Sequence, residues 1–298
     1  MQAVGHGISK DLMNKMRKLG KEFFELPLQE RMKVGRNLEG EQKDWVEGYA
    51  HDPVEFQDQK LDWIDRLYLQ IFPENRIKLQ FWPENPAGFL GRWCCRESLD
   101  VFRLKMKEFA NQTLRVLAEL VGLRDDFFTD RLDDEAIMAS SFNFYPPCPR
   151  SEQVLGFRPH SDGSGITVLL PDTNILGLQV LKDETWHQVP AFPHALLVNI
   201  GDQMEIMTNG IFKSAVHRAV TNKEKPRISM ANFYSMVPNK GLGPIERLEG
   251  EVTVPIYQTM KVEDYLKAYV ADCHIKRKRA IHNQNLSLRL QSSFKMNL

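Results

Sequence analysis

The chain has 298 residues, of which 42% are hydrophobic, so it can bury one large core or two smaller ones. Its 39 basic residues balance 39 acidic ones, which argues against nucleic acid or an anionic membrane as the principal partner. No apolar stretch approaches membrane-spanning length, and the start of the chain lacks the regions of a signal peptide. We therefore expect a cytoplasmic, monomeric protein that binds a small molecule.

Helices are predicted in the first part of the chain. Ser9 can cap a helix that Pro27 ends. The apolar residues of this helix recur at helical spacing: Leu12, Met16, Leu19 and Phe23. A longer helix is predicted over 97–121, with Gly122 as its C-cap and an apolar stripe that we assign to the core. Between the two helices, the proline-broken segment 81–86 predicts a connector and not a domain linker.

Short β-rich runs follow over 136–237, separated by Gly, Pro, Asn and Asp, which is typical of an antiparallel sandwich or jelly roll. Strands are predicted at 154–159, 166–170 and 213–220, and Asn209-Gly210 predicts a hairpin. Residues 261–279 are predicted to be helical, and the basic run 276–279 fits a solvated helix end better than a localisation signal. We expect a helical region at 1–135, a β core at 136–240 and a loop and helix at 241–298, forming one integrated unit.

The four cysteines do not form a disulfide framework or a CxxC motif. They are Cys94, Cys95, Cys148 and Cys273. The adjacent pair fits a chance occurrence in a helical region better than a redox centre. A reducing compartment, which keeps such thiols free, would also suit a ferrous cofactor.

Three residues of the β-rich segment form a candidate metal site. His160 and Asp162 are two apart at the end of a predicted strand and share a face, and His217 lies on an extended run that can deliver it from across a barrel. Two histidines and one carboxylate are the ligands of the facial triad, which holds non-haem Fe(II) and leaves positions open for substrates and O₂. For His160 and Asp162 taken alone, the alternative is a solvated turn. For His217 taken alone, it is a hydrogen-bonded histidine in a sheet.

Arg227 and Ser229 follow His217 on an apparent strand. Because they are spaced by two, their side chains point the same way. A planar guanidinium and a hydroxyl on one face form a suitable receptor for a carboxylate. Phe233 shares this face, and it either borders a substrate pocket or packs in the core. The order of these motifs predicts an oxygen-activating enzyme.

With these motifs the chain resembles the plant 2-oxoglutarate/Fe(II)-dependent dioxygenases. The motifs that carry the resemblance are NFYPPC at 143–148, HSD at 160–162, NIGD at 199–202, NG at 209–210, HR at 217–218 and RIS at 227–229. WVEGY at 45–49, DW at 62–63 and FWPENP at 81–86 are similar to the branch of the SRG1-like proteins and the codeine and thebaine O-demethylases. The similarity covers nearly the whole chain, and it specifies the family much better than the substrate.

The resemblance implies a mainly β fold with flanking helices, in which the core is a double-stranded β-helix (jelly roll, cupin-like). It assigns iron ligation to His160, Asp162 and His217. It assigns the distal carboxylate of 2-oxoglutarate to Arg227 and Ser229, with Tyr145 and Asn143 completing the pocket. For Asn143 a turn before Pro146 is the alternative, and for Tyr145 a packed core position is the alternative.

The reaction implied is the oxidation of a small molecule, with Fe(II) as cofactor, 2-oxoglutarate and O₂ as cosubstrates, and ascorbate as reductant. 2-Oxoglutarate becomes succinate and CO₂. The substrate is hydroxylated, or O-demethylated with release of formaldehyde; the motifs do not choose between these outcomes and desaturation.

We expect the substrate to be a mostly apolar aromatic or alkaloid-like metabolite. Candidate pocket residues are Phe142, Phe144, Met230, Phe233, Tyr234 and Met236. These stretches show no cluster of charges beyond Arg227, as a highly charged substrate would require. Core packing is the alternative for each of these side chains.

Relatives usually begin a few tens of residues earlier, with a strand and a helix before the segment that reads QAVGHGI at 2–8 here. The tail 284–298 also differs from the usual ending. A missing strand is expected to expose a sheet edge. Two alternatives therefore stay open: a truncated, weakly active or non-catalytic paralogue, and an Fe(II) oxidase of the same fold that does not use 2-oxoglutarate.

Overall fold

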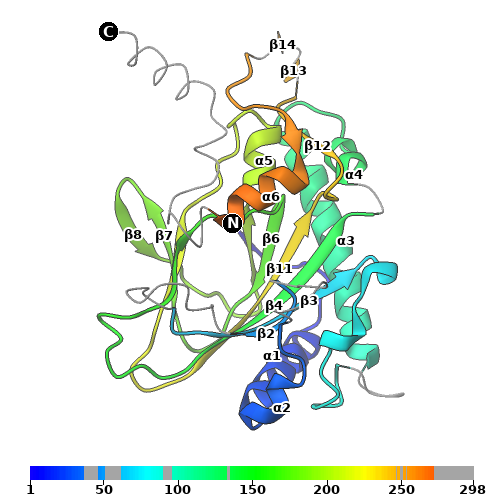
Figure 1. The fold of residues 1–298 in the computed structure, drawn as a ribbon. Helices are drawn as coiled ribbons and strands as arrows, with labels where there is room; N and C mark the ends of the chain where they lie inside the picture. Colours follow the sequence, from blue (N-terminus) through cyan, green and yellow to red (C-terminus); the bar gives the residue numbers. More distant parts are fainter. Residues whose placement is uncertain are drawn as a thin grey trace.

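The computed structural model describes residues 1–36, 46–50, 62–89, 96–132, 135–245, 247–248, 251–252 and 254–271. Two antiparallel sheets face each other around a cavity (Figure 1). The seven-stranded sheet has the order β1 (Gln2–Ala3), β9 (Leu196–Ile200), β6 (Ile166–Leu170), β11 (Arg227–Ser235), β4 (Ile137–Tyr145), β3 (Asp65–Phe72) and β2 (Gly48–Ala50). The four-stranded sheet has the order β5 (Leu155–His160), β10 (His217–Val220), β7 (Leu178–Lys182) and β8 (Thr185–Gln188).

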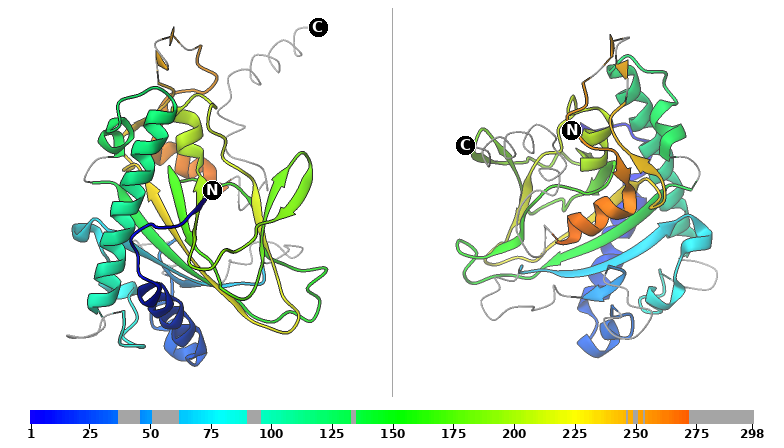
Figure 2. Two further views of the ribbon diagram at one scale, coloured as in Figure 1. Left: turned by 180° about the vertical axis from the view of Figure 1, so that it is seen from behind. Right: turned by 45° about the horizontal axis from the view of Figure 1, so that its top comes forward.

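Helices cover the large sheet and one end of the cavity. The helices are α1 (Lys10–Glu25), α2 (Leu28–Met32), α3 (Arg96–Leu120), α4 (Phe127–Leu132), α5 (Asp202–Met207) and α6 (Val262–Ala271), with 3₁₀ turns η1 (Glu74–Arg76) and η2 (Leu79–Phe81). The remaining strands form two small ribbons, β12 (Gly241–Leu242) with β15 (Met260–Lys261) and β13 (Arg247–Leu248) with β14 (Glu251–Val252). Figure 2 shows α1 and α3 on the outer face of the large sheet. No helix among the described residues is long and apolar enough to cross a membrane.

The two long helices confirm their predictions. The Ser9 hydroxyl accepts a hydrogen bond from the Leu12 backbone N–H at 3.2 Å, which caps α1. Gly122 has φ +67° after α3, and its N–H donates to the Glu119 carbonyl while the next N–H reaches Ala118. This pair of bonds satisfies the last carbonyls of α3 in a Schellman motif, which requires the left-handed conformation that glycine adopts without strain.

The inner and outer faces of the large sheet follow from the alternation of its strands, as β3 shows. Leu67, Leu69 and Ile71 are completely buried in the core against the helices. Arg66 and Tyr68 alternate with them and line the cavity. Each leucine or isoleucine buried in this way contributes roughly 1.5–3 kcal/mol to folding. The core is thus on one side of the sheet and the cavity on the other.

Several local predictions were wrong. Asn209 and Gly210 do not join two strands: with φ of 49° and 82° they end α5, and their N–H groups donate to Ile206 and Glu205. Both a hairpin turn and a helix end use positive φ, so the dipeptide does not distinguish them. Helix α5 itself was missed. The extended run expected at 213–220 is a strand only over His217–Val220.

The first part of the chain is less helical than expected, because it supplies β1, β2 and β3 to the large sheet. The division at residues 135 and 240 stays a prediction. At one edge of the large sheet, Gln2 and Ala3 pair with Leu197 and Leu196. The predictions for Cys94, Cys95 and Cys273, and the basic end of the last helix at 276–279, lie outside the described residues. Cys148 is a buried free thiol.

Candidate metal centre and adjoining pocket

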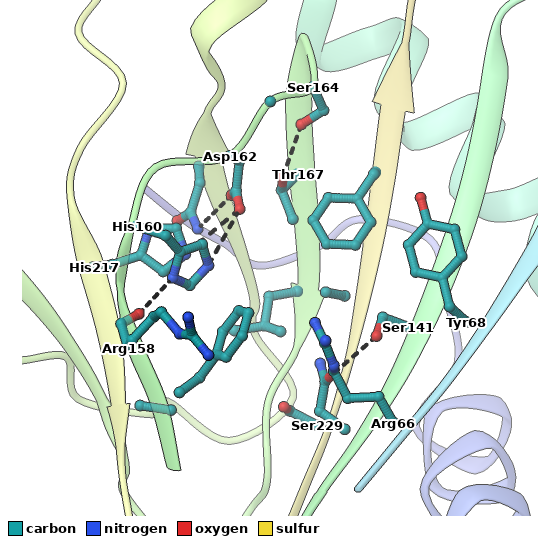
Figure 3. Close-up of a pocket in the computed structure, with 18 of the residues that line it drawn as sticks. Arg66, Tyr68, Ser141, Arg158, His160, Asp162, Ser164, Thr167, His217 and Ser229 are labelled. Carbon is teal, nitrogen blue, oxygen red and sulfur yellow. Dashed lines mark hydrogen bonds and ion pairs between the residues drawn. The ribbon is translucent and has the colours of Figure 1, made fainter. Parts of the chain in front are cut away.

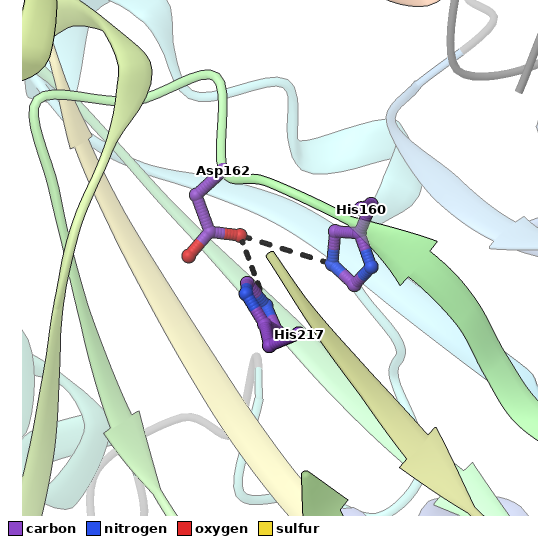
Figure 4. Close-up of side chains that lie close together, drawn as sticks. All are labelled: His160, Asp162 and His217. Carbon is purple, nitrogen blue, oxygen red and sulfur yellow. Dashed lines mark ion pairs between the residues drawn. The ribbon is translucent and has the colours of Figure 1, made fainter. Parts of the chain in front are cut away.

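The three candidate metal ligands lie together inside the barrel. One ligand atom from each of His160, Asp162 and His217 lies within 4.8 Å of the others (Figure 4). The Asp162 Oδ1 atom is 3.8 Å from the Nε2 atom of His160 and 3.5 Å from that of His217. His217 pairs directly with His160 in the ladder between β10 and β5. The expectation that His217 arrives from across the barrel was therefore wrong, because it lies on the neighbouring strand.

Both histidines are held in the form that binds a metal. The Nδ1 atom of His160 is 2.8 Å from the Arg158 carbonyl, and that of His217 is 3.1 Å from the Ala215 carbonyl. A carbonyl only accepts, so each Nδ1 carries and donates a hydrogen, which leaves Nε2 as the nitrogen that faces Asp162 and can bind a metal. Burial, and then the neighbouring His217, lower the pKa of His160 to about 3. His160 is therefore neutral at physiological pH, as a metal ligand must be.

A set of hydrogen bonds fixes the loop that carries Asp162. The Asn199 amide donates to Asp162 Oδ2 at 3.3 Å, and the Asp202 N–H donates to the Asp162 carbonyl at 2.7 Å. Buried Asp202 also accepts from the Ser161 hydroxyl at 3.0 Å. The carboxylate can therefore turn only a short way from the histidines. None of these supporting roles was predicted from the sequence, although Asn199 and Asp202 lie in the NIGD motif.

Helix α6 is fastened to the same loop by two tyrosines. The Tyr265 hydroxyl donates to Asp202 Oδ2 at 2.8 Å, and the Tyr269 hydroxyl donates to the Ser161 carbonyl at 2.7 Å. A Cβ on Gly163 would lie 3.2 Å from the Tyr269 ring, so the loop and the helix are in close contact. The i, i+4 spacing of the two tyrosines places both on one face of the helix, and this spacing is the sequence signal that could have predicted their shared contact with the loop.

The candidate carboxylate receptor lies in the same cavity, which has a volume of about 350 Å³. In the ladder between β11 and β4, Arg227 pairs with Tyr145 and Ser229 pairs with Asn143. Arg227 is 4% exposed, and its guanidinium carbon lies 4.8 Å from the centre of the Tyr145 ring. Its Nε and Nη1 atoms are buried and have no hydrogen-bond partner among the described residues. Buried guanidinium donors are normally satisfied, so these two indicate a bound anion.

The cavity wall differs from the expected one. Of the six aromatic and methionine candidates only Phe233 lines the cavity. Phe142, Met230, Tyr234 and Met236 are buried in the core on the opposite face, and Phe144 packs against that core. Four arginines from other segments also line the cavity: Arg36, Arg66, Arg158 and Arg218. Figure 3 shows Arg158 near His160 and His217, and Arg66 on the other side of the cavity near Ser229.

A jelly-roll barrel that encloses two histidines and an aspartate has the architecture of a non-haem iron oxygenase. Residues 136–236 match the 2OG-Fe(II) oxygenase superfamily, and residues 1–85 match the N-terminal region named for the non-haem dioxygenase in morphine synthesis. The chain is 36% identical to codeine O-demethylase of Papaver somniferum, over 89% of this chain and 71% of that protein. It is 37% identical to a flavonol synthase/flavanone 3-hydroxylase of Eustoma exaltatum subsp. russellianum, over 89% of this chain and 76% of that protein.

Among solved structures, the crystal structure of JOX2 in complex with 2OG, Fe and JA has a TM-score of 0.81 and 33% identity, covering 90% of this chain and 76% of that one. The chain therefore belongs to the 2-oxoglutarate/Fe(II)-dependent oxygenases. It is an oxidoreductase of the jelly-roll fold, and its cofactor and cosubstrate are Fe(II) and 2-oxoglutarate. The expected family, fold class and enzyme class are confirmed, and the plant relatives support a plant origin.

Proposed function

We propose that the enzyme hydroxylates or O-demethylates a small, mostly apolar aromatic metabolite. In this proposal Fe(II) is bound by His160, Asp162 and His217. The distal carboxylate of 2-oxoglutarate is bound by Arg227 and Ser229, with Tyr145 and Asn143 completing its pocket. The enzyme acts as a cytoplasmic monomer, with ascorbate as the reductant of its iron and without nucleic acid or membrane as partner.

The observation that carries the proposal is the pair of unsatisfied donors on Arg227 in the cavity that holds the metal candidates. A dicarboxylic keto acid fits this arrangement, because one end can chelate a metal while the other accepts from a guanidinium fork. Ser229 lies two residues from Arg227 on the same strand and lines the same cavity. Nitrogen and carboxylate donors suit Fe(II), so the residues present fit both groups.

The metal ligands and the carbonyls behind them have separate roles in the proposed reaction. The three metal ligands occupy one face, which leaves positions on the other face for ligands. The bound iron supplies the oxidation of a C–H bond, coupled to the conversion of 2-oxoglutarate and O₂ to succinate and CO₂. Where the oxidised carbon is an O-methyl group, the resulting hemiacetal collapses to formaldehyde and an alcohol. The carbonyls that hold both Nδ1 hydrogens keep the imidazoles oriented through the cycle.

The walls of the cavity support a substrate with an apolar body. Apolar and aromatic lining side chains include Tyr68, Phe157, Leu169, Leu178, Ala231 and Phe233. Tyr68 and Phe233 stack at 6.0 Å between ring centres, which presents a broad aromatic surface. The relatives named for codeine O-demethylation and flavonol synthesis, and the JA in the JOX2 structure, also support a small organic substrate. An alkaloid-like amine is less favoured by the arginines that line the cavity.

Succinate release tests the proposal. Purified enzyme with Fe(II), ascorbate and 2-oxoglutarate is given aromatic metabolites, alkaloids, amino acids and gibberellin-like acids in turn. We expect substrate-dependent succinate only with compounds that carry an apolar ring system, and formaldehyde only with aryl methyl ethers. Exclusive turnover of amino acids would contradict the aromatic substrate. Absence of succinate with every compound, together with absence of 2-oxoglutarate consumption, would contradict the reaction itself.

A further inference from the structure

The NIGD segment at 199–202 packs directly on the loop that carries Asp162. The segment forms the end of β9 and the start of α5, and the loop, which we call the Asp162 loop (161–165), joins β5 to β6. A Cβ on Gly201 would collide with the Ser164 carbonyl oxygen, so glycine allows the two segments to approach this closely. The NIGD segment is therefore placed to act on the metal ligand in that loop.

The main chain of the Asp162 loop is fixed by hydrogen bonds. The carbonyls of all five of its residues accept one each. In chain order the donors are the Tyr269 hydroxyl, the Asp202 N–H, the Gln203 side-chain amide, the Gln203 N–H and the Gly201 N–H, at 2.7, 2.7, 2.8, 3.1 and 2.9 Å. With its main chain held, the Asp162 side chain keeps only its own torsions. The second of these is broad, so contacts of the carboxylate decide how its oxygens point.

The two oxygens of the Asp162 carboxylate have different surroundings. Oδ1 faces both histidines, at 3.8 Å from Nε2 of His160 and 3.5 Å from Nε2 of His217. Oδ2 is turned away from them (Figure 4) and accepts a hydrogen bond from the Asn199 side-chain amide at 3.3 Å. In the part of the chain that the structure describes, this amide is the one hydrogen-bond donor to Oδ2. Asn199 therefore determines which oxygen the buried carboxylate offers to a metal.

Asn199 reaches the carboxylate from a fixed position in the large sheet. It pairs with Thr167 in the ladder between β9 and β6. Its neighbour Val198 is buried in the core against the helices, and Asn199, on the alternate face of the strand, lines the cavity together with Asp162. A neutral amide holds one oxygen without an opposite charge of its own, so the carboxylate keeps the negative charge that attracts a metal ion.

We propose that Asn199 is a positioning residue that keeps Asp162 a one-oxygen ligand of the metal, an inference that rests on the metal site of the proposed function. A carboxylate can bind a metal through one oxygen or through both. With Oδ2 held by Asn199, two imidazoles and Oδ1 occupy three of six octahedral positions. The keto acid group of 2-oxoglutarate takes two of the others and leaves one. A carboxylate that bound through both oxygens would take that last position and leave none for O₂.

The number of water molecules on a bound ion tests this role without turnover. Mn(II) in the natural protein should carry three exchangeable waters, and one after 2-oxoglutarate is added. Asn199→Leu has a side chain of similar size without the amide, so Mn(II) should carry two waters in this variant and none with 2-oxoglutarate. The waters are counted from the relaxation of solvent protons and from the Mn(II) resonance in water enriched in the magnetic oxygen isotope. Succinate release by the Fe(II) form of the variant should fall roughly 10- to 100-fold.

Asn111→Leu is the matched control. It removes the same amide from α3, where Asn111 accepts from the Tyr234 hydroxyl at 3.0 Å on the core side of the large sheet. This control should keep the natural water counts. A purely structural role of Asn199 predicts lower stability or weaker Mn(II) binding with unchanged water counts, and that result would overturn the proposal. If Asn199→Leu does not fold, the natural protein decides, because two waters in place of three without 2-oxoglutarate contradict a one-oxygen ligand.

Failure of this proposal is distinguishable from failure of the proposed metal site. If the metal site is wrong, the natural protein does not bind equimolar Mn(II), or His217→Ala binds it equally well, and both proposals fall. If only the role of Asn199 is wrong, Mn(II) binds in equimolar amount and is lost in His217→Ala, while Asn199→Leu keeps the water counts of the natural protein.

Discussion

Replacement of Arg227 by methionine should separate its binding role from its structural one. Methionine keeps an unbranched side chain in the site but removes the buried charge and the two unsatisfied donors. Unpaired buried donors cost about 1–3 kcal/mol, so their removal favours the ligand-free variant. The lost contact with the Tyr145 ring costs about 1 kcal/mol in the other direction. We therefore expect Arg227→Met without ligands to unfold at or slightly above the temperature of the natural protein.

The response to 2-oxoglutarate should change in the opposite sense. At a concentration a hundredfold above its Kd, a ligand stabilises the native state by about 2.7 kcal/mol, which is roughly 4 °C for a protein of this size. Loss of a buried charged contact weakens binding by about 2–5 kcal/mol. At the same concentration the variant should therefore shift by less than about 1.5 °C. Arg227→Met should therefore keep the stability of the ligand-free protein and lose most of its response to 2-oxoglutarate.

The assay is thermal unfolding under anaerobic conditions with Mn(II), with and without 2-oxoglutarate. Arg227→Lys keeps the charge but not the fork and should recover only part of the shift. Arg115→Met, on the exposed face of α3, should behave like the natural protein. If Arg227→Met keeps the full 2-oxoglutarate shift, Arg227 is not the receptor of the distal carboxylate. If the ligand-free variant unfolds many degrees lower, the argument from unsatisfied donors is wrong.

Three further predictions concern the metal centre and the stability of the fold. His217→Ala should retain no equimolar Fe(II) after desalting while its far-ultraviolet circular dichroism is unchanged; retained iron would remove His217 from the ligand set. Tyr269→Phe should lower the unfolding free energy by about 1 kcal/mol and weaken metal retention, whereas unchanged retention would make the helix contact with the loop irrelevant to the metal. Burial, followed by the charge of Asp65, raises the pKa of Tyr49 from 10 to about 12, so its contribution to stability is complete below pH 10 and is lost as the pH rises toward 12. The stability difference between the natural protein and Tyr49→Phe should move in favour of the variant over that interval, and a constant difference would refute the assignment.

Local signals predicted several of the elements and the proximity of two of the candidate ligands. The strand at Ile166–Leu170 and the cap at Ser9 depend on neighbouring residues only, and both lie where the sequence placed them. The proximity of His160 and Asp162 was predictable because residues two positions apart at a strand end lie on the same side, whatever the rest of the chain does. The position of His217 beside His160 depends on which strands pair, and no local pattern contains that information.

The sequence contained part of the information about which residues line the cavity, but the prediction did not apply it correctly. Met230 and Tyr234 differ from Ser229 and Phe233 by an odd number of residues on β11, so a strict alternation places them on the opposite face. The structure buries that face in the core. Arg66 was a harder case, because it reaches the cavity only when β3 pairs with β4, and the paired residues of that ladder are between 66 and 79 positions apart in the sequence. Sheet order of this kind is set by the packing of the whole domain.

The two tyrosine hydroxyls of α6 have a consequence for anyone who wishes to redesign the specificity of this enzyme. Leu266 and Val270 of the helix line the cavity, whereas Tyr265 and Tyr269 hold the segment that carries Asp162. Exchange of the whole helix with that of a relative would therefore disturb the iron while it altered the pocket. A library that varies Leu266 and Val270 and keeps both tyrosines changes the shape offered to new compounds and leaves the metal geometry untouched.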